Sequence, residues 1–145
     1  MTLSAVIFPI GQDLYAVAAD TVREVVAQPR ATRLPTVPAA LLGVFNLRGD
    51  VVPMFDTAAL LGVGTHGNAP FAVVIATAAG PAGLAVDGLP RVAVLDEPIA
   101  VSELRGGLGT YSVDGAIAVL IDVEAVLLPH TNLGAATLTD GLVNR

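Results

Sequence analysis

Residues 43–56 have the sequence GVFNLRGDVVPMFD, and they predict two short strands joined by a tight turn at Arg48-Gly49. Apolar residues occupy both flanks, and glycine tolerates the positive φ angles that a two-residue hairpin loop requires. Asp56 directly precedes TAALL, where its carboxylate can accept hydrogen bonds from the free N–H groups of a first helical turn. The stretch therefore predicts a β-hairpin that ends at the N-cap of a short helix.

A similar pattern recurs later in the chain. The segment GAIAVLIDVEAVLL from Gly115 resembles GDVVPMFDTAALL from Gly49, and in both segments the glycine precedes the capping aspartate by seven residues. GPAGLAVDGLPRVAVL from Gly80 resembles GQDLYAVAADTVREVV from Gly11, and the offsets between matching segments are 66 to 69 residues. We therefore predict a duplicated unit with its junction near residues 62–70. Val22 and Val92 are expected at equivalent positions, while the sequence leaves open whether the two halves exchange strands.

Short apolar runs separated by Gly and Pro predict an all-β domain. The predicted strands are Leu3–Ile10, Leu14–Ala18, Val22–Ala27, Gly43–Leu47, Asp50–Phe55, Phe71–Thr77, Gly83–Val86, Arg91–Leu95, Leu108–Ser112 and Ala116–Ile121. Each half thus supplies about five strands that end in a short helix, and five short strands reduce their exposed edges by curling into a small barrel. The predicted fold is all-β: two packed, pseudo-duplicated, five-stranded small barrels, SH3- or OB-like, with short helices. They form one domain over residues 1–145, in which 130–145 are a loose tail.

The amino-acid composition restricts the classes of function that the chain can have. The chain has 145 residues, of which 54% are hydrophobic and 14% charged, enough for one domain with a substantial core. The absence of cysteine excludes disulfides and thiolate chemistry. The net charge of −6, scattered arginines and 4% aromatic content argue against nucleic-acid binding. The uncharged stretch 57–86 is broken by Gly and Pro and the N-terminus lacks a basic signal-peptide region, so a cytoplasmic protein without membrane insertion is expected.

The sequence offers little for catalysis. His66 and His130 are the only histidines, and neither belongs to a metal-ligand or nucleophile motif. The acidic residues mostly occupy predicted turns and caps, where backbone hydrogen bonding is their ordinary role. Gly62 to Gly67 match G-x-G-x-x-G, but a nucleotide-binding loop needs a preceding strand and a following helix, and here that order is inverted. We therefore expect no enzyme activity, no metal and no cofactor, with 62–67 as a connector.

Arg48 is the unusual residue, because it places a guanidinium at the tip of an apolar hairpin. In one interpretation it caps carbonyl groups or pairs with a nearby acid such as Glu24 or Asp50. In the other it is rigidly presented to dock a partner. The residues alone leave both interpretations open.

Taken together, these segments resemble the CheW family of chemotaxis coupling proteins. GVFNLRGDVVPMFD is similar to the central signature of that family, and further matches follow in order over about residues 3–128. They are G-x-x-x-Y-A-V from Gly11, V-x-E-V-V from Val22, L-P-x-x-P from Leu34, G-L-A-V-D-G-L from Gly83 and G-x-x-x-x-L-I-D-V-E-x-V-L from Gly115. The two five-stranded barrels of the family agree with the fold predicted from the internal repeat.

The resemblance implies a non-catalytic adaptor. CheW-like proteins bind the cytoplasmic signalling tip of chemoreceptors and the regulatory domain of the histidine kinase CheA, at receptor arrays on the inner face of the membrane. A receptor tip is a helical hairpin, which would lie in a groove between the barrels. The groove residues implied by the match are Val22, Glu24, Gly43, Asn46, Leu47, Arg48 and Val92. For each of them a purely structural role is the alternative. The resemblance also implies kinase contacts at exposed edges of the barrel ends, without assigning them to particular residues.

Two other functions are compatible with the sequence. A CheW-like scaffold could serve a non-flagellar pathway such as pilus or gliding motility. A small-molecule-binding or catalytic β-barrel belongs to a different class, and it would show a pocket with convergent titratable groups instead of apolar surface.

Overall fold

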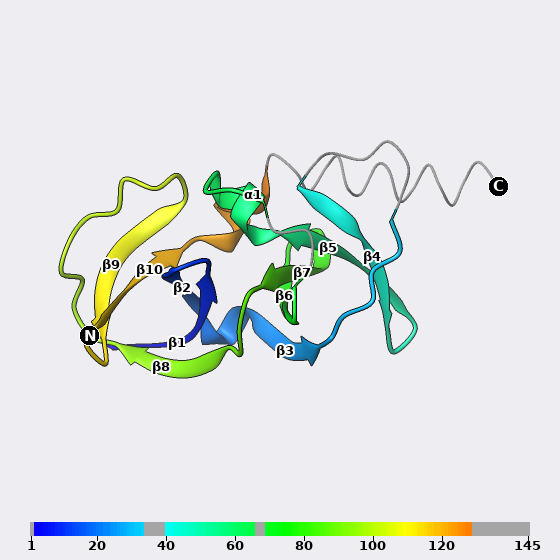
Figure 1. The fold of residues 1–145 in the computed structure, drawn as a ribbon. Helices are drawn as coiled ribbons and strands as arrows, with labels where there is room; N and C mark the ends of the chain where they lie inside the picture. Colours follow the sequence, from blue (N-terminus) through cyan, green and yellow to red (C-terminus); the bar gives the residue numbers. More distant parts are fainter. Residues whose placement is uncertain (1, 34–39, 66–68, 129–145) are drawn as a thin grey trace.

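The computed structural model describes residues 2–33, 40–65 and 69–128, which fold into ten strands with short helical segments (Figure 1). The all-β prediction is confirmed, and every predicted strand is present with bounds that differ by at most three residues. The strands are β1 Leu3–Ile10, β2 Asp13–Ala18, β3 Val22–Ala27, β4 Leu41–Leu47, β5 Asp50–Asp56, β6 Phe71–Thr77, β7 Gly80–Val86, β8 Arg91–Leu95, β9 Gly107–Val113 and β10 Ala116–Ile121. The expected tail at 130–145, the motif at Leu34–Pro38 and both histidines lie outside the described residues.

Both predicted helix caps are confirmed. Helix α1 (Thr57–Leu61) begins after Asp56, whose Oδ1 accepts a hydrogen bond from Ala59 N at 3.3 Å. Residues 123–128 are also helical, and Asp122 Oδ1 accepts from Ala125 N at 3.2 Å. Each carboxylate satisfies a backbone donor that a first helical turn leaves without an intrahelical partner.

The two halves of the chain exchange strands. One sheet has the order β8-β1-β2-β10-β9 and the other β3-β6-β7-β5-β4. Each sheet therefore takes one β-hairpin, β1–β2 or β6–β7, from one half of the chain and its other three strands from the other half. Replacing each strand by its repeat counterpart converts one order into the other, so the duplication seen in the sequence is a pseudo-symmetry of the structure.

Each sheet curls into a barrel around its own apolar cluster. All five strands of the first sheet, here called barrel A, contribute to a cluster that includes Ile7, Leu95 and Leu120. The second sheet, barrel B, encloses Phe45 and Met54 with small residues from its other strands. A sheet whose strands all face one cluster must curl around it, which reduces its exposed edges.

A third and larger cluster joins the barrels. Phe8, Val17 and Tyr15 of barrel A are buried in it with Ile75 and Leu84 of barrel B. Alternate residues of one strand point to opposite faces of its sheet, so β1 supplies Ile7 to the barrel interior and Phe8 to the inter-barrel core. This alternation explains why continuously apolar strands are required: both faces are covered.

Because this core contains Tyr15, its stability should decrease at alkaline pH. Burial, with a smaller contribution from the charge of Asp13, raises the pKa of Tyr15 above its ordinary value of 10.0. Above that pH the unfolded chain loses the phenolic proton first, so the free energy of unfolding should decrease, by up to about 1.4 kcal/mol per pH unit while the pH lies between the two pKa values. Urea denaturation from about pH 8 to about pH 11 should show a shallower decrease for Tyr15→Phe. Equal slopes in both proteins would contradict this.

Candidate functional site

The β4–β5 hairpin holds Arg48 at a fixed position. Arg48 and Gly49 form its two-residue turn with φ of 52° and 91°, the signs that a type I′ turn needs. Asn46 Oδ1 accepts a hydrogen bond from Gly49 N at 2.9 Å and closes the turn from one side. The side chain of Asn46 thus stabilises the turn that presents Arg48.

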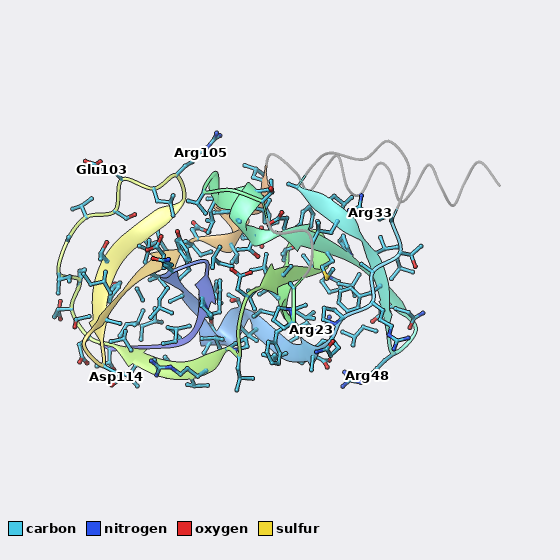
Figure 2. The ribbon with its side chains drawn as sticks, in the orientation of Figure 1. Arg23, Arg33, Arg48, Glu103, Arg105 and Asp114 are labelled. Carbon is cyan, nitrogen blue, oxygen red and sulfur yellow. The ribbon has the colours of Figure 1, made fainter. Side chains whose placement is uncertain are left out.

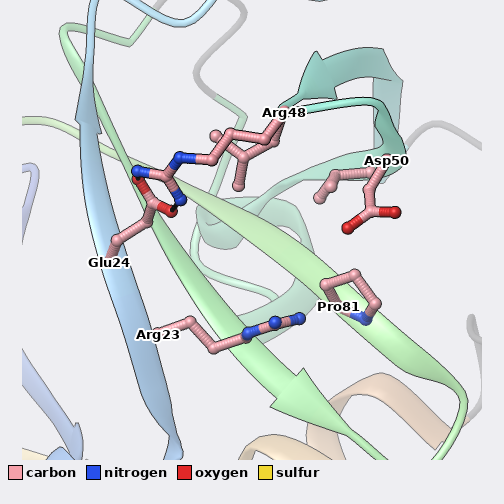
Figure 3. A pocket seen from close by; sticks show the side chains of 7 residues that line it. Arg23, Glu24, Arg48, Asp50 and Pro81 are labelled. Carbon is pink, nitrogen blue, oxygen red and sulfur yellow. Dashed lines mark hydrogen bonds and ion pairs between the residues drawn. The ribbon is translucent and has the colours of Figure 1, made fainter.

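Arg48 forms a bidentate ion pair with Glu24 on β3. Arg48 Nη1 donates to Glu24 Oε1, and Nη2 donates to Oε2 at 3.1 Å (Figure 3). Strands β3 and β4 are the two edges of the barrel B sheet, so this pair joins the edges at the mouth of the barrel. Of the acids expected to pair with Arg48, the structure selects Glu24. The Arg48 side chain remains largely exposed to solvent, so the pair still leaves a cationic surface for a partner.

A shallow cavity of about 280 Å³ lies beside the ion pair. Its lining residues are Arg23, Glu24, Leu47, Arg48, Asp50, Val52 and Pro81. Figure 3 shows the Arg23 side chain extending across the cavity toward Pro81, and within the described part of the chain Arg23 has no ion-pair partner. No group of three or more His, Asp or Glu in residues 2–33, 40–65 and 69–128 could hold a metal ion.

The structure brings together Glu24, Asn46, Leu47 and Arg48 at this mouth, but not the other predicted site residues. Val22 begins β3 and packs against the inter-barrel core. Gly43 lies at the other end of β4, where Val44 exchanges two backbone hydrogen bonds with Thr32. Val92 is on β8 of barrel A and is 71% exposed.

One expectation about the repeat is wrong. Val22 and Val92 do not correspond, because Val22 lies opposite Ile75, whereas Val92 lies opposite Val6, which matches Val73. In the β-ladders Val25 lies opposite Val73, and Val92 lies opposite Val6 at the matching position of the other barrel. Val6 and Val73 each lie four residues before the last paired residue of their hairpin's first strand, so the counterpart of Val92 is Val25.

Val25, Val92 and Val94 form an exposed apolar strip, called here the valine strip. Val73 and Val6, the cross-strand partners of Val25 and Val92, belong to the inter-barrel core, so these two valines continue that core into solvent. Val25 is 39% and Val94 57% exposed. Sequence reasoning missed both, although the apolar alternation of Val92 and Val94 on a short strand is a signal that could have identified Val94. Strands β3 and β8 run along the same edge of the molecule (Figure 1).

No helix of the described residues is long and apolar enough to cross a membrane.

Comparison with known proteins gives consistent matches that cover most of the chain. A family model described as CheW-like domain matches residues 4–128. A probable chemotaxis protein CheW of Rhizobium etli is 33% identical over 129 residues, covering 82% of this chain and 83% of the relative. The chemotaxis protein CheW of Rhizobium meliloti is 27% identical over 129 residues, covering 82% of this chain and 83% of the relative. The crystal structure of the scaffolding protein TtCheW from Thermoanaerobacter tengcongensis superposes with a TM-score of 0.75 at 26% identity, covering 88% of each chain.

Proposed function

This chain belongs to the CheW-like family and is an adaptor in chemotaxis signalling; from that premise we propose that it couples chemoreceptor tips to the regulatory domain of a CheA-type histidine kinase. The adaptor acts by binding and not by chemistry. Its proposed place is the cytoplasm, at receptor arrays on the inner face of the membrane, where both partners are accessible.

The valine strip carries this proposal. A helical hairpin presents apolar side chains at intervals of three and four residues, and it needs an apolar surface with polar groups at the edge. Val25, Val92 and Val94 supply the apolar surface, and Arg48 with Glu24 supplies the polar edge. Exposed apolar surface at the rim of a folded core is typical of a protein-binding site.

We assign the predicted site residues different roles within this surface. Val92 and Arg48 contact the receptor tip directly, as does Leu47, which is half-buried beside Arg48. Glu24, Asn46 and Gly43 act mainly by holding the hairpin and its guanidinium in place. Val22 supports the strip from beneath, because it packs against the inter-barrel core.

The experiment is a titration of the purified protein with a receptor-tip helical hairpin and, separately, with the CheA regulatory domain. Val92→Glu should weaken hairpin binding at least about tenfold, because it places a charge in an apolar contact. Val101→Glu is the matched control: Val101 is 90% exposed in the loop after β8, and its variant should bind like the wild type. Full binding by Val92→Glu would contradict the assigned surface, and binding of neither partner by the wild type would contradict the proposed coupling.

We also propose that the two barrels unfold as one domain. Barrel A is incomplete without β1 and β2, and barrel B without β6 and β7, so each half of the chain depends on the other. A single calorimetric transition is the expected result.

A further inference from the structure

Each barrel has an ion pair at the equivalent position, but the acidic and the basic residue have exchanged places. In barrel B, Glu24 on β3 pairs with Arg48 at the β4–β5 turn. In barrel A, Arg91 on β8 pairs with Asp114 at the β9–β10 turn, with Nη1 and Oδ2 3.1 Å apart.

The strand registers establish that these pairs correspond. Glu24 lies opposite Val74, which is three residues before Thr77, the last paired residue of β6. Arg91 lies opposite Ile7, which is likewise three residues before Ile10, the last paired residue of β1. The turn residues correspond as well. Arg48 and Asp114 are each the first residue of a two-residue turn, with φ of 52° and 51°.

The more exposed member of the ion pair has the opposite charge in the two barrels. In barrel B the outer group is the Arg48 guanidinium, whose side chain is 76% exposed, while Glu24 is 25% exposed. In barrel A the outer group is the Asp114 carboxylate, 77% exposed, while Arg91 is 49% exposed. Exposed ion pairs contribute little to stability, and either polarity would join the barrel edges equally well. The reversal therefore matters for what a partner encounters and not for how the barrels close.

Strands β3 and β8, which carry the valine strip, run between the two outer charges (Figure 1 and Figure 2). Figure 2 shows Arg48 and Asp114 at opposite ends of the edge along which β3 and β8 run. Neighbouring charges add to this difference, since Arg23 lies near Arg48, whereas Asp96 and Glu97 directly follow β8. A helix placed along the strip thus meets a cation at the barrel B end and an anion at the barrel A end.

We propose that Arg48 and Asp114 polarise this surface and admit a partner helix in one direction only. The occupant is an amphipathic helix with acidic side chains where it meets Arg48 and basic side chains where it meets Asp114. This inference rests on the proposed function, since it concerns the same surface, and it adds the charge pattern of the partner and Asp114 as a specificity-determining residue. Opposite charges across an interface fix its orientation and disfavour wrong partners.

The test uses two helical peptides with the same leucine-rich face. The bipolar peptide has glutamates at one end and lysines at the other, and the acidic peptide has glutamates at both ends. At low ionic strength the wild type should bind the bipolar peptide about fivefold more tightly, and the preference should disappear in about 0.5 M salt.

The decisive variant reverses the pair in barrel A. Arg91→Asp combined with Asp114→Arg keeps an ion pair and exposes cations at both ends, so this variant should prefer the acidic peptide. Arg48 shows that the same turn position accepts arginine at this φ. The control is Glu103→Arg combined with Arg105→Glu, which also conserves net charge but changes exposed residues away from the strip (Figure 2). It should retain the wild-type preference.

Titration with the receptor-tip hairpin separates this inference from the proposed function. If the hairpin binds, but the wild type and the Arg91→Asp/Asp114→Arg variant prefer the same peptide, the polarity proposal is wrong and the coupling role stands. If the hairpin does not bind but the peptide order reverses in the variant, the polarity proposal stands and the assigned partner is wrong. Failure of the wild type to bind either peptide would overturn the strip as a helix-binding surface.

Discussion

Arg48→Glu should reduce binding of the receptor tip by about tenfold or more while leaving the fold intact. The substitution removes the exposed cation at the barrel B mouth and places a second carboxylate opposite Glu24. The cost in the free energy of unfolding should stay at about 1 kcal/mol, because exposed ion pairs contribute little. Isothermal titration with the receptor-tip hairpin measures the first effect, and urea denaturation with circular dichroism measures the second.

A charge exchange separates the two roles of Arg48. Glu24→Arg combined with Arg48→Glu can restore the ion pair across the barrel mouth, but it removes the guanidinium from the hairpin tip. If Arg48 contacts the partner directly, the double variant should recover stability and remain defective in binding. Recovery of full binding would show that only the ion pair matters, and direct contact would then be wrong.

Gly43→Ala should destabilise the protein by about 2–4 kcal/mol. A Cβ at Gly43 would lie 2.4 Å from the carbonyl oxygen of Thr32 and 2.8 Å from its carbonyl carbon. Both atoms are backbone atoms in a segment hydrogen-bonded to Val44, so they cannot move away without breaking that pairing. The φ of 155° at Gly43 adds strain for any residue with a side chain.

Gly115→Ala is the matched control for this substitution. Gly115 has a φ of 83°, but a Cβ there would meet nothing within 4 Å, so only backbone strain of about 1–2 kcal/mol is expected. Chemical denaturation of both variants gives the comparison. Equal destabilisation would contradict the clash with Thr32. A binding defect of Gly43→Ala that accompanies partial unfolding would identify Gly43 as a structural residue of the hairpin.

The elements themselves were predictable from local sequence. Apolar runs between Gly and Pro predicted the strands, Arg48-Gly49 and Asp114-Gly115 predicted hairpin turns, and Asp56 and Asp122 predicted helix caps. These features depend on interactions among residues close in the chain, so short windows of sequence contain the necessary information. The candidate partners of Arg48 also came from the sequence, as did the duplicated unit.

The tertiary structure decided which strands pair and which side chains meet. The exchange of β1–β2 and β6–β7 between the barrels could not be predicted, because both hairpins have the same apolar pattern and fit either place. Strand pairing also made Val25 and not Val22 the counterpart of Val92, since Val25 lies opposite Val73 and Val92 lies opposite Val6. The Arg91–Asp114 pair joins residues that are 23 positions apart in sequence, and the Arg48–Glu24 pair joins residues that are 24 apart. Local propensity and turn chemistry determined the strands, whereas pairing over long sequence separations determined the surface that a partner meets.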